Sequence, residues 1–420
     1  MAVAKVVIFA KFADLEEPLD YRIPSQASAP VGSFVQVSLG KRQVQGIVIA
    51  HAQESQYELK DVQVIPGSLP LELVELAKWL AVRSGCSVAT ALSAMLPPES
   101  GGVPLVRWRV DEVAATIDLT DKQQQVVDYL RTRQPMLKTE LSRALGVSLV
   151  PINNLVLQGI LIPADEVHSP WSLPEVEALT DEQEAVLAKV AKKSEDFSRG
   201  GEYLLYGVTG SGKTEIYIRL AQRVLDLGMT ALILVPEIAL TAQVVARFKK
   251  AFGKLVAVLH SGLSASHRTA DWDKISRGEY AIVIGTRSAA FAPLDNLGLV
   301  VLDEEHEPAY KQDETPRYHA RDVAVFRAKW HKALLVLGSA TPALESFARA
   351  EAGRYELIEL PHRVHSCASV TAEIIDMRQE LAQGNRDMLS RELRFALEET
   401  LAKGEQALVF LNRRGVAPTV

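Results

Sequence analysis

Residues 207–214 read GVTGSGKT, and this stretch decides the fold of the central part of the chain. It matches the pattern GxxxxGK[ST] and stands between an apolar run that predicts a strand and a stretch that predicts a helix. Its glycines allow backbone N–H groups to close around phosphates, helped by the positive end of the helix dipole. We expect Lys213 to reach the β and γ phosphates and Thr214 to ligate Mg²⁺. The remaining residues of the predicted phosphate-binding loop are Gly207, Gly210, Ser211 and Gly212.

A cluster of acids ends another apolar run, VVLDEEH at residues 300–306. Such acids alone are typical of a solvated turn. At the carboxyl end of a parallel strand beside a P-loop, however, they are placed to hold Mg²⁺ and to activate water. We expect Asp303 to hold the metal through its water shell, and Glu304 to orient or deprotonate the attacking water. The pair therefore favours nucleoside triphosphate hydrolysis over phosphate transfer to a small acceptor.

Apolar runs separated by helical stretches predict an α/β fold with a doubly wound parallel sheet around these motifs. The runs lie at residues 203–206, 230–235, 256–259, 281–284, 297–302 and 333–337. Further runs that indicate the start of another α/β unit lie at 357–360, 372–375 and 407–411.

Polar loops follow three of the predicted strands, at residues 236–241, 285–289 and 338–342. Each loop alone is typical of an ordinary strand-to-helix turn. Because the carboxyl ends of parallel strands meet at one edge of a sheet, we expect the three loops to form a groove beside the nucleotide.

The first 105 residues predict a small β-rich unit, in which β-branched runs are bounded by Pro, Gly and Ser. From about residue 115 to 165, three helical stretches, a Gly turn and a final extended stretch have the spacing of a winged helix-turn-helix. Thr120 is the expected N-cap of its first helix. Modules of this kind bind DNA in many proteins and bind protein in many others, so both functions stay open.

The composition is that of an ordinary globular protein, and 420 residues predict about three domains at ~150 residues each. No apolar stretch approaches the ~18 residues that a membrane span needs, so we expect a cytoplasmic protein without a membrane partner. Cys86 and Cys367 stand far apart, which argues against a disulfide framework and a zinc cluster. The net charge of −6 counts mildly against nucleic acid as a partner, although a basic groove can lie on an acidic protein.

The order and spacing of GVTGSGKT, DEEH and SAT resemble motifs I, II and III of superfamily 2 helicases. The string LTDEQ is placed like their adenine-reading Q motif, with Gln183 as its glutamine. Finer strings resemble one family, the PriA primosomal proteins that restart stalled replication forks. They are VPEI at 235–238, HSG at 260–262, GTRSA at 285–289, YKQ at 310–312, PRYHARD at 316–322 and LNRRG at 411–415.

The resemblance implies an ATP-dependent 3′ to 5′ DNA helicase of replication restart, with ATP and Mg²⁺ as cofactors. Its partners would be forks with the 3′ end of a nascent strand, primosome proteins and single-stranded DNA-binding protein. The implied catalytic residues are Lys213, Asp303 and Glu304, and the implied coupling residues are His306, Ser339 and Thr341. The implied contacts to the terminal nucleotide are Asp20, Gly40 and Lys60, and the other implied DNA contacts are Arg287, Lys311, Arg317 and Tyr318.

The resemblance also implies four regions. These are a 3′-end-binding domain at 1–105, a winged helix at 112–168, a RecA-like lobe at 173–350 and an incomplete second lobe at 351–420. PriA proteins continue with a cysteine-rich, zinc-binding insertion and a second lobe that carries an arginine finger, and this sequence contains neither. Such a guanidinium is worth ~10³-fold or more in related NTPases. We therefore expect a truncated form that binds ATP–Mg²⁺ and DNA but turns ATP over poorly.

Two other functions are compatible with parts of the sequence. The chain could be a structure-specific fork-binding module, in which residues 1–165 bind DNA and the nucleotide site is vestigial or regulatory. It could also be a P-loop kinase or a transporter ATPase. A kinase needs an acceptor pocket and a lid, and a transporter ATPase needs its own signature motif, and the sequence shows none of these.

Overall fold

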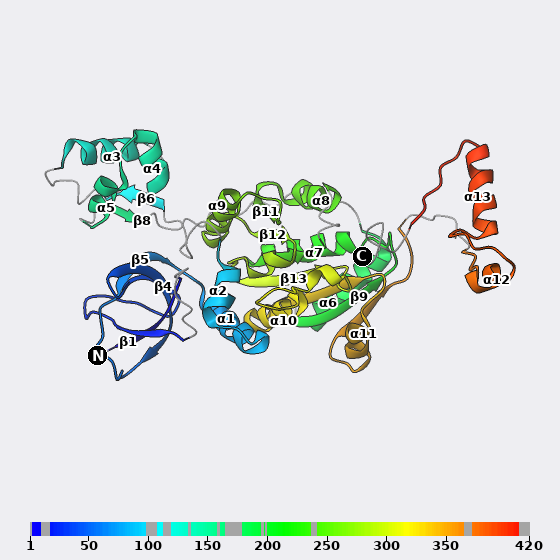
Figure 1. Cartoon of the computed structure of the whole chain (residues 1–420), viewed down its shortest axis with the longest axis horizontal. Helices are drawn as coiled ribbons and strands as arrows, with labels where there is room; N and C mark the ends of the chain where they lie inside the picture. The colour runs from blue at the N-terminus through cyan, green and yellow to red at the C-terminus, as the bar shows by residue number, and fades with distance from the viewer. Residues whose placement is uncertain are drawn as a thin grey trace. The chain divides into compact units, whose positions relative to one another are not determined.

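The computed structural model describes most of the chain in two compact units, Met1–His365 and Ser366–Val420 (Figure 1). The described residues are 2–9, 17–97, 107–111, 119–132, 136–157, 160–163, 179–194, 197, 200–236, 242–364 and 372–410. The expected loop at 237–241 and the string LNRRG at 411–415 lie outside them. In the described part of the chain, no helix combines the length and the apolar character that crossing a membrane requires.

The N-terminal region forms an antiparallel five-stranded sheet in the order β2-β1-β4-β3-β5. Its strands are β1 (Val3–Ile8), β2 (Leu19–Arg22), β3 (Ser33–Leu39), β4 (Arg42–Ala52) and β5 (Gln63–Ser68). Two helices follow, α1 (Leu71–Ser84) and α2 (Val88–Met95). The helix α1 ends at Gly85, whose φ of 62° lies in the left-handed region that favours glycine. The expected β-rich unit is therefore present, with β2 and β5 as strands that the sequence pattern missed.

Three helices and a small sheet make up the next region, as the winged-helix spacing predicts. Its elements are β6 (Arg107–Val110), α3 (Asp121–Arg131), β7 (Met136–Leu137), α4 (Lys138–Leu145), α5 (Leu149–Leu157) and β8 (Leu161–Pro163). Thr120 is the N-cap of α3 and shares a capping box with Gln123. Because β6 pairs with both β7 and β8, this region already includes residues before the expected boundary at 112.

A parallel seven-stranded sheet in the order β11-β12-β10-β13-β14-β9-β15 forms the central region. Its strands are β9 (Gly201–Gly207), β10 (Thr230–Leu234), β11 (Val256–Leu259), β12 (Ile282–Gly285), β13 (Leu297–Asp303), β14 (Leu334–Ser339) and β15 (Glu356–Leu360). The six strands expected around the P-loop are thus confirmed. They read as continuous apolar runs because both faces of the sheet are covered.

Two hydrophobic cores lie on opposite faces of this sheet. Leu232 and Leu234 belong to one core, and the alternating residues Ala231 and Ile233 belong to the other. The helices around the sheet are α6 (Asp181–Lys193), α7 (Lys213–Asp226), α8 (Ala242–Phe252), α9 (Ala265–Ser276), α10 (Ala320–His331) and α11 (Leu344–Glu351). Short 3₁₀ turns are η2 (Gly253–Leu255), η3 (Arg287–Phe291) and η4 (Pro308–Tyr310).

The structure corrects three of the expected strands. Residues 356–360 do not open a further α/β unit but complete the central sheet as β15, beside β9. Ile358 and Leu360 are buried there against the core that also holds α7, which explains their alternation. Residues 372–376 and 405–410 form no strand, and Ile374 is 96% exposed. The second unit is described by α12 (Met377–Ala382) and α13 (Arg391–Ala402).

Candidate nucleotide-binding and DNA-binding site

The P-loop joins β9 to α7, so its backbone N–H groups lie at the N-terminus of a buried helix. Gly210 and Gly212 have φ values of +83° and +84°, which side chains rarely adopt. A Cβ at Gly212 would also lie 2.2 Å from the amide nitrogen of Gln183. Ser211 is buried, and its hydroxyl has no partner among the described residues. This unpaired hydroxyl, at the N-terminus of α7, fits a phosphate ligand.

Lys213 is the first residue of α7 and is only 8% exposed. Its ammonium donates a hydrogen bond to the carbonyl oxygen of Gly207, at 2.9 Å. The same Nζ lies 3.9 Å from Oε1 of Glu304. The Lys213 ammonium therefore lies between the P-loop backbone and Glu304. In this position it could stabilise the negative charge of bound phosphates.

Asp303 ends β13 and is tied to α7 by a side-chain contact. The Tyr217 hydroxyl donates to Oδ1 of Asp303 at 2.9 Å. Tyr217 follows Thr214 by three residues, so both lie on the same face of α7. Thr214, the other expected Mg²⁺ ligand besides Asp303, therefore lies on the face of α7 from which Tyr217 reaches Asp303. Mg²⁺ takes few protein ligands and keeps several waters, so this pair fits it, and the described residues contain no larger metal cluster.

Burial raises the pKa of the Asp303 carboxyl, and the neighbouring Glu304 raises it further. The Tyr217 hydroxyl and the Lys213 ammonium act in the opposite direction, but the pKa remains above its ordinary value. A carboxylate that is costly to keep charged in isolation gains more from a nearby cation. A divalent cation bound beside Asp303 would favour the charged form of this carboxyl.

Gly338 leaves the space that the Tyr217–Asp303 contact occupies. It lies on β14, opposite Asp303 in the parallel register. A Cβ built at Gly338 would lie 1.7 Å from the Tyr217 hydroxyl oxygen. Sequence reasoning placed Gly338 only in the polar loop at 338–342 and missed Tyr217, because nothing in the local sequence indicates that these two residues meet at Asp303.

Glu304 sits at a sharp turn with a φ of +46°, an uncommon conformation for a non-glycine residue. The turn leaves its side chain 34% exposed, whereas Asp303 is only 8% exposed. The carboxylate lies between the Lys213 ammonium and the ring of His306, whose Nδ1 is 3.7 Å from Oε2. A backbone strain of this kind is typical of functional sites, and here it turns the acid toward the P-loop cation.

His306, Ser339 and Thr341, the expected coupling residues, are in mutual contact. The ring nitrogen Nδ1 of His306 is 2.8 Å from the Ser339 hydroxyl, and Nε2 is 3.5 Å from the Thr341 hydroxyl. The backbone N–H of Thr341 donates to the Ser339 hydroxyl at 2.9 Å. The acid cluster and the SAT loop are therefore linked through one imidazole.

Gln183 lies against the P-loop with its amide engaged by the protein. Its Oε1 accepts from the backbone N–H of Thr180 at 3.1 Å, as part of a capping box for α6. Its Nε2 donates to the carbonyl oxygen of Ser211 at 3.5 Å. The residue is only 4% exposed, so in this structure it supports the P-loop from behind.

The four implied DNA contacts of the central region divide into two pairs. Lys311 and Arg317 are exposed cations. Arg287 instead donates to the carbonyl oxygens of Ala309, at 3.3 Å, and of Lys311. The Tyr318 ring packs edge-on against a phenylalanine of η3, and burial raises its pKa to about 12. Arg287 and Tyr318 thus support the loop on which the exposed Lys311 and Arg317 lie.

Of the three implied DNA contacts in the N-terminal region, Lys60 and Gly40 are bonded to each other, and Asp20 lies on the strand whose Arg22 is bonded to Lys60. Asp20, on β2, accepts from the Lys5 ammonium at 3.1 Å. Two residues on, the backbone N–H of Arg22 donates to the carbonyl oxygen of Lys60 at 2.8 Å. The Lys60 ammonium donates to the carbonyl oxygen of Gly40, at 3.2 Å, in the turn between β3 and β4.

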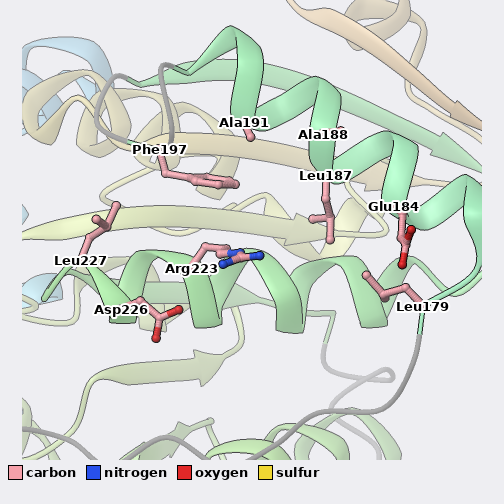
Figure 2. A pocket seen from close by; sticks show the side chains of 9 residues that line it. All are labelled: Leu179, Glu184, Leu187, Ala188, Ala191, Phe197, Arg223, Asp226 and Leu227. Atoms are coloured by element: carbon pink, nitrogen blue, oxygen red, sulfur yellow. The ribbon is translucent and has the colours of Figure 1, made fainter.

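A pocket of about 570 Å³ lies between α6 and α7 (Figure 2). Its apolar lining includes Leu187, Phe197 and Leu227, and its charged lining includes Arg223 and Asp226. No residue of the P-loop lines it. This pocket is therefore separate from the phosphate-binding loop, although both are built on α7.

Two families match this chain over the regions just described. Residues 180–350 match the DEAD/DEAH box helicase family, and residues 5–97 match the 3'DNA-binding domain (3'BD). The parallel sheet with its P-loop and acid cluster, apart from β15, thus lies in the region that matches the DEAD/DEAH box helicase family, and it has the fold of a RecA-like helicase lobe. The second match assigns the N-terminal sheet with α1 and α2 to a DNA-binding domain.

Curated relatives carry the name replication restart protein PriA. The protein of Bacillus subtilis is 36% identical over 511 residues, which cover 100% of this chain and 63% of that protein. The protein of Chlamydia muridarum is 34% identical, covering 96% of this chain and 58% of its own length. The protein of Haemophilus influenzae is 33% identical, covering 99% and 60%. The chain belongs to the PriA family and spans less than two thirds of the length of these relatives.

Proposed function

We propose that this chain is the ATP-binding and DNA-binding part of a replication-restart helicase that acts on forked DNA. One observation carries the proposal: the P-loop cation and two acids lie at the same edge of the sheet. Nζ of Lys213 lies 3.9 Å from Oε1 of Glu304, and Asp303 accepts a hydrogen bond from Tyr217 of α7. Phosphoryl transfer to water depends on positioning and on electrostatic stabilisation, and these groups supply both.

Each residue has a distinct part in the proposed reaction. Lys213 and the N–H groups of the first turn of α7 bind the phosphate oxygens and stabilise the charge that develops on them. Thr214 and Asp303 would hold Mg²⁺, which supplies charge neutralisation at the same oxygens. Glu304 orients the attacking water and accepts its proton. Gln183 lies beside the P-loop, from where its amide could turn to the adenine.

The proposed motor step depends on contacts between the site and DNA. His306, Ser339 and Thr341 would relay the state of the nucleotide to the loops that face the strand. Lys311 and Arg317 would bind phosphates, and their affinity would depend on salt. The direction we propose is 3′ to 5′. The 3′ end of a nascent strand would bind at the N-terminal sheet, at a site that includes Asp20, Gly40 and Lys60.

The partners we propose are forked DNA, primosome proteins and single-stranded DNA-binding protein. The support is the similarity to proteins named for replication restart and the match to a 3'DNA-binding domain. The net charge of −6 is compatible with this proposal, because local patches of cations and the shape of a fork would provide the contacts.

Binding of a fluorescent ATP analogue and of a labelled fork, with and without Mg²⁺, tests the proposal. We expect Lys213→Ala to weaken analogue binding about tenfold or more, since a charge-assisted hydrogen bond is worth roughly 1.5–3 kcal/mol. The control is Lys249→Ala, an exposed lysine of α8, which should bind like the unchanged chain. Failure of the unchanged chain to bind either ligand would contradict the proposal.

Turnover is tested separately in the same samples. We propose that this chain binds ATP and hydrolyses it slowly, even with forked DNA present. Fast hydrolysis that Lys213→Ala abolishes would show that this expectation is wrong. Tight fork binding without any binding of the ATP analogue would instead favour a fork-binding module with a vestigial nucleotide site.

A further inference from the structure

Glu305, the third acid of DEEH, points away from the nucleotide site. The turn at Glu304 reverses the chain, and Glu305 is only 1% exposed. Its backbone N–H donates to the carbonyl oxygen of Gly338, at 3.0 Å, which fixes it behind β14. A buried carboxylate without partners is costly, so its contacts indicate what it holds together.

The Glu305 carboxylate joins two helix starts. Oε1 accepts from the backbone N–H of Ala343, the N-cap of α11, at 2.7 Å. Oε2 accepts from the Ser346 hydroxyl at 2.7 Å and from Nη1 of Arg321 at 3.3 Å. The same Nη1 also donates to the Ser346 hydroxyl at 3.0 Å. One side chain thus ties the end of β13 to the beginnings of α10 and α11.

Each of these two helices follows a loop that the proposed reaction uses. The helix α11 follows the loop that carries Ser339 and Thr341. The helix α10 follows the loop from Lys311 to His319, which presents the exposed Lys311 and Arg317. This second loop is closed by a bridge between Lys311 and His319, and the His319 ring accepts from the backbone N–H of Arg321 at 3.1 Å.

We propose that Glu305 is a positioning residue that couples the DNA-facing loop to the nucleotide site. A shift of the loop from Lys311 to His319 would move Arg321, and Glu305 would transmit the movement to the SAT loop and to the turn at Glu304. The carboxylate suits this role because it accepts from three donors at once, one of them charged. The contacts of Glu305 with Arg321, Ser346 and Ala343 do not involve the His306 imidazole, so they form a second link between the acid cluster and the SAT loop. It rests on the proposed function, since it requires that the chain binds both ATP and DNA.

The test measures thermodynamic coupling between the two ligands. The affinity for a labelled fork is measured with and without a saturating non-hydrolysable ATP analogue plus Mg²⁺, and the two dissociation constants give a coupling ratio. The reciprocal measurement, analogue affinity with and without the fork, must give the same ratio. For the unchanged chain we expect a ratio of roughly fivefold or more, as is typical of allosteric coupling.

Two variants and one control decide the result. Glu305→Gln keeps the shape but loses the charge and one acceptor, so we expect separate affinities within about twofold and a coupling ratio near one. Arg321→Lys leaves the bonds from Glu305 to Ala343 and Ser346 in place but disturbs the bond to the DNA-facing loop. We therefore expect its coupling ratio also to fall toward one, and this variant replaces Glu305→Gln in the test if Glu305→Gln does not fold. The control is Glu351→Gln, an exposed acid at the far end of α11, which should keep the full ratio.

Several outcomes would overturn the coupling role. Variants that fold and keep the ratio of the unchanged chain would show that Glu305 only holds the lobe together. A ratio of one in the unchanged chain, with both ligands bound, would show that there is no coupling to transmit. Absence of binding of ATP analogue or fork to the unchanged chain would instead contradict the proposed function, so the two failures are distinguishable.

Discussion

Arg327 and Glu72 form a buried ion pair across 255 residues of sequence. Nε and Nη2 of Arg327 donate to the two carboxylate oxygens at 2.6 and 3.0 Å, and the two side chains are 0% and 3% exposed. Nη1 donates to the carbonyl oxygens of Ala290 and Ala292, both at 2.9 Å. The guanidinium therefore joins α1 of the DNA-binding domain to α10 and to the end of η3.

Removing one partner of this pair should destabilise the protein strongly. We expect Arg327→Met to lower the free energy of unfolding by about 3–5 kcal/mol, because the Glu72 charge stays buried and keeps only the His331 imidazole, at 3.0 Å, beside it. The double variant with Glu72→Met should recover much of this loss, since an apolar pair avoids the buried charge. Urea unfolding followed by fluorescence gives the comparison.

A matched control exists in the exposed pair of Arg83 with Asp322, which bridges the same two helices at 3.1 Å. Arg83→Gln should cost about 0–1 kcal/mol, because solvent screens an exposed pair. Equal losses for Arg327→Met and Arg83→Gln would contradict the importance that we assign to burial.

The stability of the protein should depend on pH through Glu72. Burial raises the pKa of its carboxyl, but Arg327 and His331 outweigh burial and hold the pKa below the ordinary value of 4.5. A lowered pKa means that the pair contributes its full stability above about pH 4.5 and loses it as the pH falls toward the folded-state value. The difference in urea midpoint between the unchanged chain and Glu72→Gln should therefore be constant from pH 7 to 5 and shrink below it. A difference that grows on acidification would show that the sign is wrong.

The space at Gly338 should be essential for the position of Asp303, the proposed Mg²⁺ ligand. Gly338→Ala places a methyl group 1.7 Å from the Tyr217 hydroxyl, so the Tyr217–Asp303 bond must break or the strand must shift. We expect a loss of about 1–3 kcal/mol in stability from overpacking, together with weaker Mg²⁺-dependent binding of an ATP analogue. The measurements are a urea titration and a Mg²⁺ titration at fixed analogue concentration.

Tyr217→Phe provides the control for this prediction. It removes the hydroxyl that the new methyl group meets, so the double variant should be more stable than Gly338→Ala alone. Additive losses would mean that the clash lies elsewhere.

Lys311 and Arg317 should contribute to DNA affinity through charge alone. We expect each single change to alanine to weaken fork binding similarly for every sequence and to reduce the slope of log affinity against log salt by about one. Fluorescence anisotropy titrations of a labelled fork at salt concentrations from about 50 to 200 mM would measure this slope. Lys249→Ala on α8 should leave the slope unchanged. A sequence-dependent loss would indicate base contacts instead.

Local patterns in the sequence were enough for the P-loop, the acid cluster and the strands that carry them. The spacing of Gly207, Gly212 and Lys213 contains the whole geometry of a phosphate loop, because backbone N–H groups within one turn form it. Apolar runs of four to six residues predicted the central strands, because strands that are buried on both faces carry apolar residues at every position. These features depend on residues that are close together in the chain, and so the sequence by itself determined them.

The tertiary structure alone decided which distant residues meet. An apolar run specifies that a strand is buried but not which strands flank it, so β15 could not be assigned to the edge beside β9 from its sequence. The contacts of Tyr217 with Asp303 and of Glu72 with Arg327 span 86 and 255 residues. Strand order and helix packing determine which of these residues are in contact. A buried polar group is stable only when it forms hydrogen bonds, and its partners are the groups that the fold places beside it. The sequence determined the chemistry of the site, and the packing decided what holds that chemistry in position.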